Sequence, residues 1–519
     1  MEYRSIDGTG NASATDTINA ANTAFIRTAE AVFADDHRGL VDGPNPREIS
    51  NIVVGEGDAD TENPQGLSGM MYAWGQFIDH DINLTADGRT RDPISIVVPD
   101  GDPNFPDGTI IPMNRAQVDA NGYPVNAVTG WMDASMVYGS NEATAARLRT
   151  ADGHMLTSEG NNLPVASIDP TGEEASNSGG QVGHLAGDGR ADENPSLTAL
   201  QTLFVREHNR QVDLLRAADH CLTGEEAYQQ ARAIVTAEIQ HITYSEFLPH
   251  LLGDLMIGDY QGYDACVDPR MAIEFAGAAY RFGHSTVSPR TEKLDEYGNA
   301  SGETELRDVF FQTPADFATD GGADGLLRHL GADLSQAMDA RIVEDLRNFL
   351  FDPPVGLDLA AINIQRGRDL GLPHLNEMRQ ALHLDPYTDF CQITDDAGTV
   401  AALAQVYGSV DAIDLWTGGL AERTAPGAFV GETFGTIIAD QFERTRAGDR
   451  LWYANQGFDE ATLDRIEHTR LSDIILANTD TRAIQDDPFV FYERRAAGTE
   501  AAEPDLPQLV ITPPDAVLA

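Results

Sequence analysis

The chain of 519 residues is poor in cysteine and almost free of lysine. Its three cysteines, Cys221, Cys266 and Cys391, lie far apart in the sequence. They are too few for a disulfide framework and lack the paired spacing of a cysteine zinc site, so we expect free thiols. Because Lys293 is the only lysine, nearly all of the positive charge is carried by arginine.

Basic residues are also scarce relative to acidic ones. Lys and Arg number 34 against 83 Asp and Glu, which gives a formal net charge of −49 at pH 7. Nucleic acid and anionic membrane surfaces are bound by basic patches, so this composition argues against both as partners. An acidic surface does favour solubility in a salty or calcium-rich medium.

Long apolar runs are absent from the sequence. A membrane-spanning helix needs about 18 or more consecutive apolar residues, and no such stretch occurs, so no membrane span is predicted. Residues 1–22 are polar and lack a basic segment followed by an apolar one. We therefore expect no cleaved N-terminal signal peptide.

Hydrophobic residues nevertheless make up 41% of the chain and aromatic residues 7%, which is enough for a large core. Helical periodicity dominates and strand alternation is rare, so the predicted fold class is mainly α with little β structure. We expect a single large helical domain over 61–492, with long irregular loops at 86–130 and 157–195. Residues 1–60 are predicted to form an irregular arm packed on this domain, and the Pro-, Ala- and Glu-rich residues 493–519 a tail. Helices are predicted at about 64–84, 196–218, 225–250, 270–283, 336–351 and 371–383, with more after 398.

The segment 64–84 is predicted to be an amphipathic helix with an unusual polar side. Large apolar side chains such as Trp74 and Phe77 fall on one side when residues are placed at steps of about 100°. Gln76 and His80 lie one turn apart on the other side, with Asp79 next to them. That side offers an amide, a carboxylate and an imidazole, but no Lys, Arg or Glu. Taken alone, it fits a solvated face as well as a catalytic one.

Six segments taken together resemble the animal-type haem peroxidases of the peroxidase–cyclooxygenase superfamily. They occur in the family's order and the resemblance covers residues 60–480, most of the chain. The segments are Gly75–Asp81 (GQFIDHD), Thr129–Gly139 (TGWMDASMVYG), Gly187–Glu193 (GDGRADE), Leu203–Arg210 (LFVREHNR), Tyr280–His284 (YRFGH) and Asn363–Asp369 (NIQRGRD). The resemblance implies a single helical haem-peroxidase domain that binds haem b.

The resemblance implies three catalytic residues on the open face of the haem. His80 matches the distal histidine, which would take a proton from one peroxide oxygen and return it to the other. Arg190 matches the catalytic arginine, whose fixed guanidinium would stabilise the negative charge on the leaving oxygen. Gln76 would hold the distal water or an anionic substrate such as a halide.

On the opposite face, His284 matches the proximal ligand of the haem iron. Asn363 matches its hydrogen-bond partner, which tunes how much electron density the imidazole gives to the metal. Arg281 and Arg366 are expected to serve the haem propionates or the proximal hydrogen-bond network, with ordinary salt bridges as the alternative.

Two carboxylates stand where mammalian members form ester bonds to the haem. Asp79 directly precedes the distal histidine, and Glu193 follows the catalytic arginine by three residues. We expect covalent attachment through both, although each could instead be an unreacted acid. Myeloperoxidase adds a sulfonium link from a methionine after that glutamate, and here this residue is Asn194. The extra link should be absent, so oxidation of bromide, iodide or thiocyanate is expected rather than that of chloride.

The resemblance also implies a calcium ion. Asp81 would anchor it from the helix, next to the distal histidine. The remaining ligands would come from a loop, with Trp131 contributing its backbone carbonyl. Oxygen ligands that include two carboxylates suit this hard cation. The loop ligands are Thr129, Trp131, Asp133 and Ser135.

The expected function is reduction of hydrogen peroxide, with oxidation of small anions or phenolic donors through a ferryl intermediate. Two alternatives remain open: a fatty-acid dioxygenase of the same superfamily, and a secreted adhesion or matrix protein that keeps the haem fold. Cyclooxygenases carry their radical tyrosine three residues before the proximal histidine, where this chain has Arg281, with Tyr280 one position earlier. The acidic, cysteine-poor chain resembles bacterial relatives, and we expect an extracellular protein exported without a cleaved signal.

Overall fold

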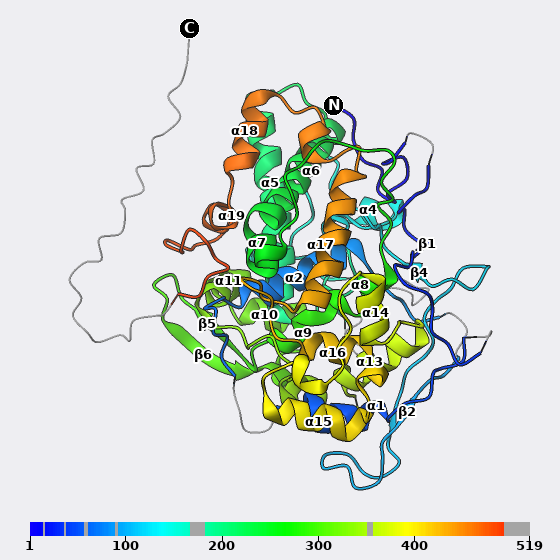
Figure 1. Ribbon diagram of the computed structural model, residues 1–519. Coiled ribbons are helices and arrows are strands. Elements are labelled where there is room, and N and C mark those ends of the chain that lie inside the picture. Colours follow the sequence, from blue (N-terminus) through cyan, green and yellow to red (C-terminus); the bar gives the residue numbers. More distant parts are fainter. Residues whose placement is uncertain are drawn as a thin grey trace.

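The computed structural model describes residues 1–13, 16–35, 38–56, 61–88, 92–166, 182–349 and 357–492. These residues fold as a mainly helical single domain, as predicted (Figure 1). The helices are α1 (Pro46–Ile49), α2 (Met70–Ile82), α3 (Ser135–Tyr138), α4 (Glu142–Arg147), α5 (Pro195–Ala218), α6 (Gly224–Ile242), α7 (Leu248–Leu252), α8 (Ile273–Gly277), α9 (Gly283–Thr286), α10 (Pro314–Thr319), α11 (Ala323–Ala332), α12 (Glu344–Arg347), α13 (Leu359–Asp369), α14 (Leu375–Ala381), α15 (Ala397–Tyr407), α16 (Leu415–Ala421), α17 (Glu432–Ala447), α18 (Glu460–His468) and α19 (Leu471–Asn478).

Strands are short and pair only as antiparallel hairpins or ribbons in the described residues. Strand β1 (Thr23–Ala24) pairs with β4 (Val125–Asn126), and β2 (Ile96–Val97) with β3 (Ile110–Ile111). The longest pair is β5 (Arg290–Leu294) with β6 (Ala300–Glu305), in which Arg290 lies opposite Glu305. Because these strand pairs are short, the fold is stabilised mainly by helix packing, as the scarcity of strand alternation predicts.

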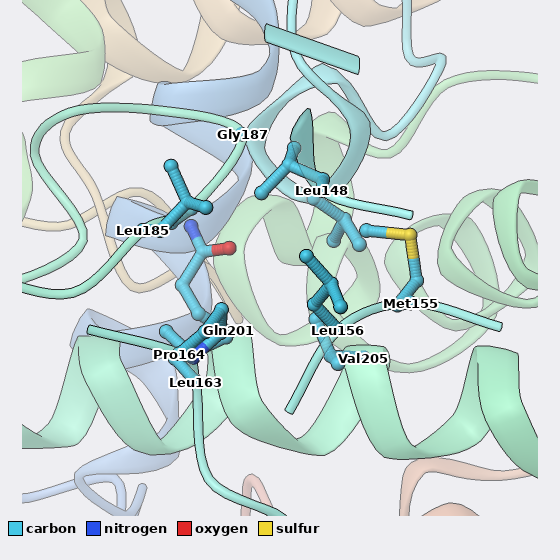
Figure 2. A pocket seen from close by; sticks show the side chains of 11 residues that line it. Leu148, Met155, Leu156, Leu163, Pro164, Leu185, Gly187, Gln201 and Val205 are labelled. Atoms are coloured by element: carbon cyan, nitrogen blue, oxygen red, sulfur yellow. The ribbon is translucent and has the colours of Figure 1, made fainter. Parts of the chain in front are cut away.

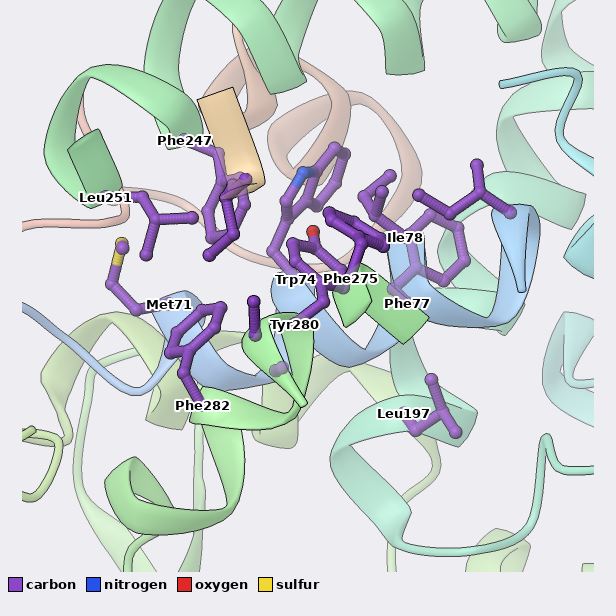
Figure 3. Packing of buried hydrophobic residues seen from close by; sticks show 14 of the residues in the cluster. Met71, Trp74, Phe77, Ile78, Leu197, Phe247, Leu251, Phe275, Tyr280 and Phe282 are labelled. Atoms are coloured by element: carbon purple, nitrogen blue, oxygen red, sulfur yellow. The ribbon is translucent and has the colours of Figure 1, made fainter. Parts of the chain in front are cut away.

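Helix α2 runs through the middle of the molecule and carries much of the core (Figure 1). Its apolar side chains are fully buried, among them Trp74 and Phe77. The ring of Phe77 stacks on Phe204 of α5, with 5.2 Å between centroids. Figure 3 shows the same cluster continuing to Tyr280 and Phe282 below α2. Burial of this side orients the opposite side of α2, with its polar residues, toward one region of the interior.

Predicted and observed helices agree best where the helix is long. The prediction for 196–218 corresponds to α5, which begins at Pro195 because the Asn194 side chain accepts a hydrogen bond from the backbone N–H of Leu197. The prediction for 225–250 is met by α6, a π-helical stretch at Thr243–Phe247 and α7 in direct succession. The prediction for 336–351 is wrong, since within the described residues only α12 is helical there.

The predicted irregular arm is not irregular throughout. It contains α1 and a π-helical stretch at Ser50–Val54. Its first residues lie against the rest of the domain, where Arg4 forms a buried ion pair with Asp449 (2.6 Å). The tail predicted at 493–519 lies outside the described residues, as does part of the loop at 157–195.

The cysteines and the membrane prediction can also be compared with the structure. Cys221, Cys266 and Cys391 are exposed and free, as expected. None of the helices in the described part of the chain is both long and apolar enough to cross a membrane.

Candidate active site

His80 lies on the polar side of α2, yet that side is not solvated. The residue is 3% exposed, and its Nε2 atom lies 3.6 Å from a carboxylate oxygen of Glu193. Its Nδ1 atom is buried and has no hydrogen-bond partner among the described residues. Burial, with the nearby charge of Arg190, lowers the pKa of His80 to about 3. The imidazole is therefore neutral at ordinary pH and able to act as a base.

Arg190 reaches His80 from a loop that is distant in sequence. Its guanidinium donates to both carboxylate oxygens of Asp188 (2.9 and 2.8 Å) and to the backbone carbonyls of Asn83 (3.1 Å) and His80 (3.4 Å). Burial opposes the charge of Asp188, but the Arg190 guanidinium outweighs it and holds the pKa of that carboxyl at about 2. Asp188 is the residue that the sequence reasoning missed, since a single Asp two positions before the arginine carries no signal of its role.

Gln76 and Glu193 continue the polar cluster on the same side of α2. The Gln76 amide donates to Glu193 (2.9 Å) and accepts from the Asn194 side chain (2.8 Å). Burial raises the pKa of Glu193 to about 7, against the attraction of Arg190. The Glu193 side chain remains 33% exposed, so the carboxyl is not enclosed by packed protein on all sides.

Asp79 lies beside the distal pair. It accepts a hydrogen bond from the Asn83 side chain and lies 3.7 Å from the Arg190 guanidinium. Burial raises its pKa to about 6, although Arg190 and Arg281 both act to lower it. Like Glu193, it is partly open, with 26% of its side chain exposed. The sequence pattern thus brings two carboxyls of raised pKa next to one base.

His284 is in α9, which contacts α2. Its Nδ1 atom lies 2.8 Å from the amide nitrogen of Asn363, and no hydrogen bond to Nε2 occurs among the described residues. Burial, with the charge of Arg281, lowers the pKa of His284 to about 3. The imidazole is partly buried and neutral. A metal at Nε2 needs the ring proton on Nδ1, so the Asn363 side chain would have to turn its oxygen toward Nδ1 when a metal is bound.

The two arginines predicted near the haem have different surroundings. Arg281 donates to the side-chain oxygen of Asn363 (2.6 Å), which places it in the proximal network. Burial lowers its pKa to about 10. Arg366 instead forms ion pairs with Asp87 (2.7 Å) and Asp369 (3.0 Å). Arg366 therefore forms ordinary salt bridges, which was the alternative to a role at the haem.

These residues fit a haem. Two neutral imidazoles lie on different elements, and His284 would hold the haem iron through Nε2. Arginines and partly exposed carboxyls line the space beside them. The described residues hold no group of three or more His, Cys, Asp or Glu side chains placed to bind a metal ion directly.

The predicted calcium ligands also lie together. Asp81 and Asp133 are both fully buried, and burial together with the Asp133 charge holds the pKa of Asp81 well above its usual range. Asp81 accepts from the backbone N–H of Ser135 (2.5 Å), and Asp133 from the hydroxyl of Thr129 (2.9 Å). One carboxylate oxygen of Asp133 has no partner among the described residues. Trp131, the fifth member, is buried in the same loop.

An apolar hollow lies behind the loop of Arg190 and was not expected from the sequence (Figure 2). Gly187 and Leu185 of this loop form one wall, and Gln201 of α5 is the polar residue in it. The Gln201 side-chain nitrogen is buried without a partner in the described part of the chain. The hollow gives the loop an apolar back and leaves its polar residues to face His80.

Comparison with known proteins identifies the family of the chain. A family model described as animal haem peroxidase matches residues 3–489. The chain is 34% identical to eosinophil peroxidase of Mus musculus, over 88% of this chain and 72% of that protein. It is also 34% identical to the peroxidasin homologue pxn-2 of Caenorhabditis elegans, over 90% of this chain, but spans only 39% of the length of that relative. The chain therefore belongs to the animal haem peroxidase family.

Solved structures show the same fold. Peroxidase A from Dictyostelium discoideum superposes with a TM-score of 0.86 at 31% identity, covering 94% of this chain and all of that one. A fatty acid alpha-dioxygenase from Oryza sativa superposes with a TM-score of 0.76 at 21% identity, over 92% of this chain and 84% of that one. The second likeness is one of fold alone.

Proposed function

We propose that this chain is a haem-dependent peroxidase that reduces hydrogen peroxide and oxidises small anions or phenolic donors. One observation carries the proposal. A neutral, buried imidazole at His80 lies beside a guanidinium, Arg190, that a buried carboxylate holds in place. When bound, haem supplies the iron and the redox capacity for peroxide cleavage.

His80 acts as the base and then as the acid of the reaction. Its low pKa keeps the ring unprotonated before peroxide arrives, so it accepts a proton from one oxygen and donates it to the other. Arg190 stabilises the charge on the departing oxygen, and its bonds to Asp188 mean that no reorganisation is needed. Gln76 orients water or an anionic donor between these groups.

On the other side, His284 would hold the haem iron and Asn363 would position its ring. Arg281 fixes the amide of Asn363 and contributes positive charge beside it. We assign Arg281 to the proximal hydrogen-bond network. Arg366, held by two aspartates, supports the chain around it and does not bind the haem directly.

Asp79 and Glu193 are proposed to attach the haem through ester bonds. Two partly exposed carboxyls with raised pKa values beside one cofactor are costly as anions, and ester formation removes both charges. Mass spectrometry of the denatured holoprotein after peroxide turnover tests this: haem should remain with the chain, and be released in stages by Asp79→Asn and Glu193→Gln. Quantitative release from the turned-over native chain would contradict the links.

Calcium is proposed to bind between Asp81 and the loop at 129–135. A divalent cation would neutralise two buried carboxylates and satisfy the orphaned oxygen of Asp133. Because Asp81 follows His80, the ion would brace the distal base. Chelation should therefore lower both thermal stability and the peroxide rate, and added calcium should restore them.

The proposal as a whole is tested by the absorption spectrum of haem-loaded protein before and after peroxide. The wild type should show a Soret band that shifts within seconds. His80→Ala should keep the band but react at least about 100-fold more slowly, the scale of a lost acid–base group. His284→Ala should lose the axial ligand. His208→Gln, at a buried histidine bonded to Tyr138 far from this cluster, is the matched control.

The dioxygenase alternative is weaker on geometry. Tyr280 is 4% exposed, its ring stacks on Phe275 (4.6 Å), and its hydroxyl has no partner among the described residues. A tyrosine packed in this way is not presented to a fatty acid. Oxygen consumption with linoleate or arachidonate should stay at background while bromide or iodide is oxidised.

A further inference from the structure

A continuous row of aromatic rings leads from the candidate active site toward the surface. Tyr280 contacts Phe442 (5.6 Å between centroids), Phe442 contacts Tyr244 (5.8 Å), and Tyr244 contacts Trp452 (4.9 Å). Three helical segments and one loop supply these four rings, so no single sequence motif predicts the row. The catalytic arrangement described above makes no use of it.

The inner end of the row lies at the active site. Tyr280 directly precedes Arg281 and is four residues before His284. Burial raises the pKa of Tyr280, and the charge of Asp79 raises it further, which shows that the phenol is within electrostatic reach of the distal cluster. Figure 3 shows the Tyr280 ring under α2, among Trp74, Phe275 and Phe282.

The outer end branches at Trp452. This indole is 2% exposed, and it contacts Tyr453 (5.1 Å between centroids) and Tyr260 (6.1 Å). Both tyrosines are partly exposed. The hydroxyl of Tyr260 is within hydrogen-bond distance of the Asn455 side chain (2.5 Å), so it belongs to the protein surface and not the core.

The environment of each ring determines which ring can stabilise a radical after it loses an electron. Tyr244 donates its hydroxyl proton to the carbonyl of Phe442 (2.6 Å), and a carbonyl cannot take that proton over. Tyr280 has no partner at all among the described residues. The guanidinium of Arg446 also lies over Tyr244 (5.2 Å) and Tyr260 (5.5 Å), which disfavours positive charge on both. An indole can lose an electron and keep its proton, so Trp452 is the favoured resting place.

We propose that this row conducts electrons inward from a second oxidation site at Trp452, Tyr453 and Tyr260, where one-electron donors too large for the haem pocket are oxidised. The inference rests on the proposed peroxidase function. Each peroxide accepts two electrons and two protons and becomes two molecules of water. Two donor molecules each lose one electron at the surface, and the protons come from solvent.

The test uses haem-loaded protein mixed with one equivalent of peroxide and no small donor, then frozen for electron paramagnetic resonance. The wild type should show an indole radical, and protein grown with deuterated tryptophan assigns the signal to that side chain. Trp452→Phe, which keeps a ring in place, should abolish that signal. It should also lower the rate of ferrocytochrome c oxidation by about tenfold or more while leaving iodide oxidation unchanged.

Two further variants keep the outcome interpretable. Tyr244→Phe removes only a hydroxyl, and it should also slow cytochrome oxidation. It replaces Trp452→Phe as the test if that variant folds poorly. Trp416→Phe is the control, because this buried indole bonds to the Arg281 carbonyl (3.4 Å) but is outside the row. An indole radical that survives Trp452→Phe, or disappears in Trp416→Phe, would overturn the proposal. A wild type that oxidises iodide normally without any indole radical would overturn it too, whereas a wild type inert to peroxide would overturn the peroxidase function itself.

Discussion

At the scale of single residues, the Asn363 side chain lies between Arg281 and His284 and contacts both. Because Arg281 donates to its side-chain oxygen, its amide nitrogen faces Nδ1 of His284. An amide nitrogen in this place donates to Nδ1 and leaves the ring proton on Nε2, whereas a metal at Nε2 needs that proton on Nδ1. Asn363→Asp would present an acceptor instead, make the imidazole more basic, and lower the ferric–ferrous midpoint potential.

Removal of the Asn363 side chain distinguishes its effect on the orientation of the His284 ring from its effect on the basicity of that ring. Asn363→Ala should weaken haem retention or activity by about 10- to 100-fold, the usual cost of removing a partner of a metal ligand. Redox titration of both variants, with resonance Raman of the iron–histidine stretch, gives the measurement. A raised potential in Asn363→Asp would show that the amide does not govern the ligand.

The residues of the site could be named from the sequence, but their mutual bonds could not. The motif around His80 places Gln76 and Asp79 beside it, because helical spacing is local information. The approach of Arg190 depends on a loop distant in sequence, and the family resemblance alone suggested it. The role of Asp188, which holds that arginine, emerged only from the folded geometry.

At the level of elements, local periodicity predicted long helices and failed where tertiary contacts dominate. The segment 336–351 has helical spacing, yet Gln336 bridges to Glu62 and Ile342 to Gly55 in extended conformation. Backbone pairing with distant segments outweighs a weak helical preference there. The short α11 and α13 were missed as well, although Ala323, Leu326, Leu327 and Leu330 of α11 follow helical spacing.

The loop that carries Arg190 can be tested through its glycines. A Cβ atom on Gly187 would lie 2.6 Å from backbone atoms of Met136, Val137 and Gly139, so the loop would have to move. A displacement of about 1 Å at a catalytic group can cost about 100-fold in rate. We expect Gly187→Ala to retain haem and lose most of its peroxide reactivity by stopped flow.

The same loop supplies its own control. A Cβ atom on Gly189 meets nothing within 4 Å. Gly189→Ala should therefore react with peroxide at the wild-type rate. Equal losses in the two variants would mean that loop flexibility, and not the position of Arg190, governs the reaction.

A buried pair of carboxyls lies between α5 and α6. Glu207 and Glu238 both face the Gln211 amide, at 2.6 and 3.2 Å. One oxygen of Glu238 has no partner in the described residues. Burial, with the charge of Glu207, holds the pKa of Glu238 well above its usual range. The other polar or charged groups around the pair are Arg210, Arg465 and Asn478.

This pair makes stability depend on pH in a defined direction. A carboxyl whose pKa is raised by folding stabilises the fold fully below its unfolded pKa, and this contribution is lost as pH rises toward the folded value. Glu238→Gln removes the titration. The variant should match the wild type near pH 4 and exceed it in unfolding free energy by about 1 to 3 kcal/mol at pH 8. Denaturant unfolding at both pH values measures this, and a wild type more stable than the variant at pH 8 would refute it.

For the whole molecule, the dominant property is its charge of −49. A field of this size repels anions before they reach Arg190 and Arg281, and attracts cations. The proposed small substrates include iodide and bromide, so the global field opposes the local positive charge of the site. Salt screens the distant charges first, because the Debye length falls from about 30 Å at 0.01 M to about 10 Å at 0.1 M.

Salt should therefore change substrate preference without any change in the site. Between about 0.01 and 0.1 M sodium nitrate, kcat/KM for iodide should rise severalfold, up to about tenfold, as repulsion is screened. A cationic aromatic amine should show the opposite trend, and a neutral phenol should show none, which makes it the internal control. Steady-state kinetics at fixed pH give all three slopes. If iodide and the neutral phenol responded alike, salt would be acting on the fold or on haem binding. The acidic surface would then have no part in selecting donors, and selection would rest with Gln76 and Arg190 alone.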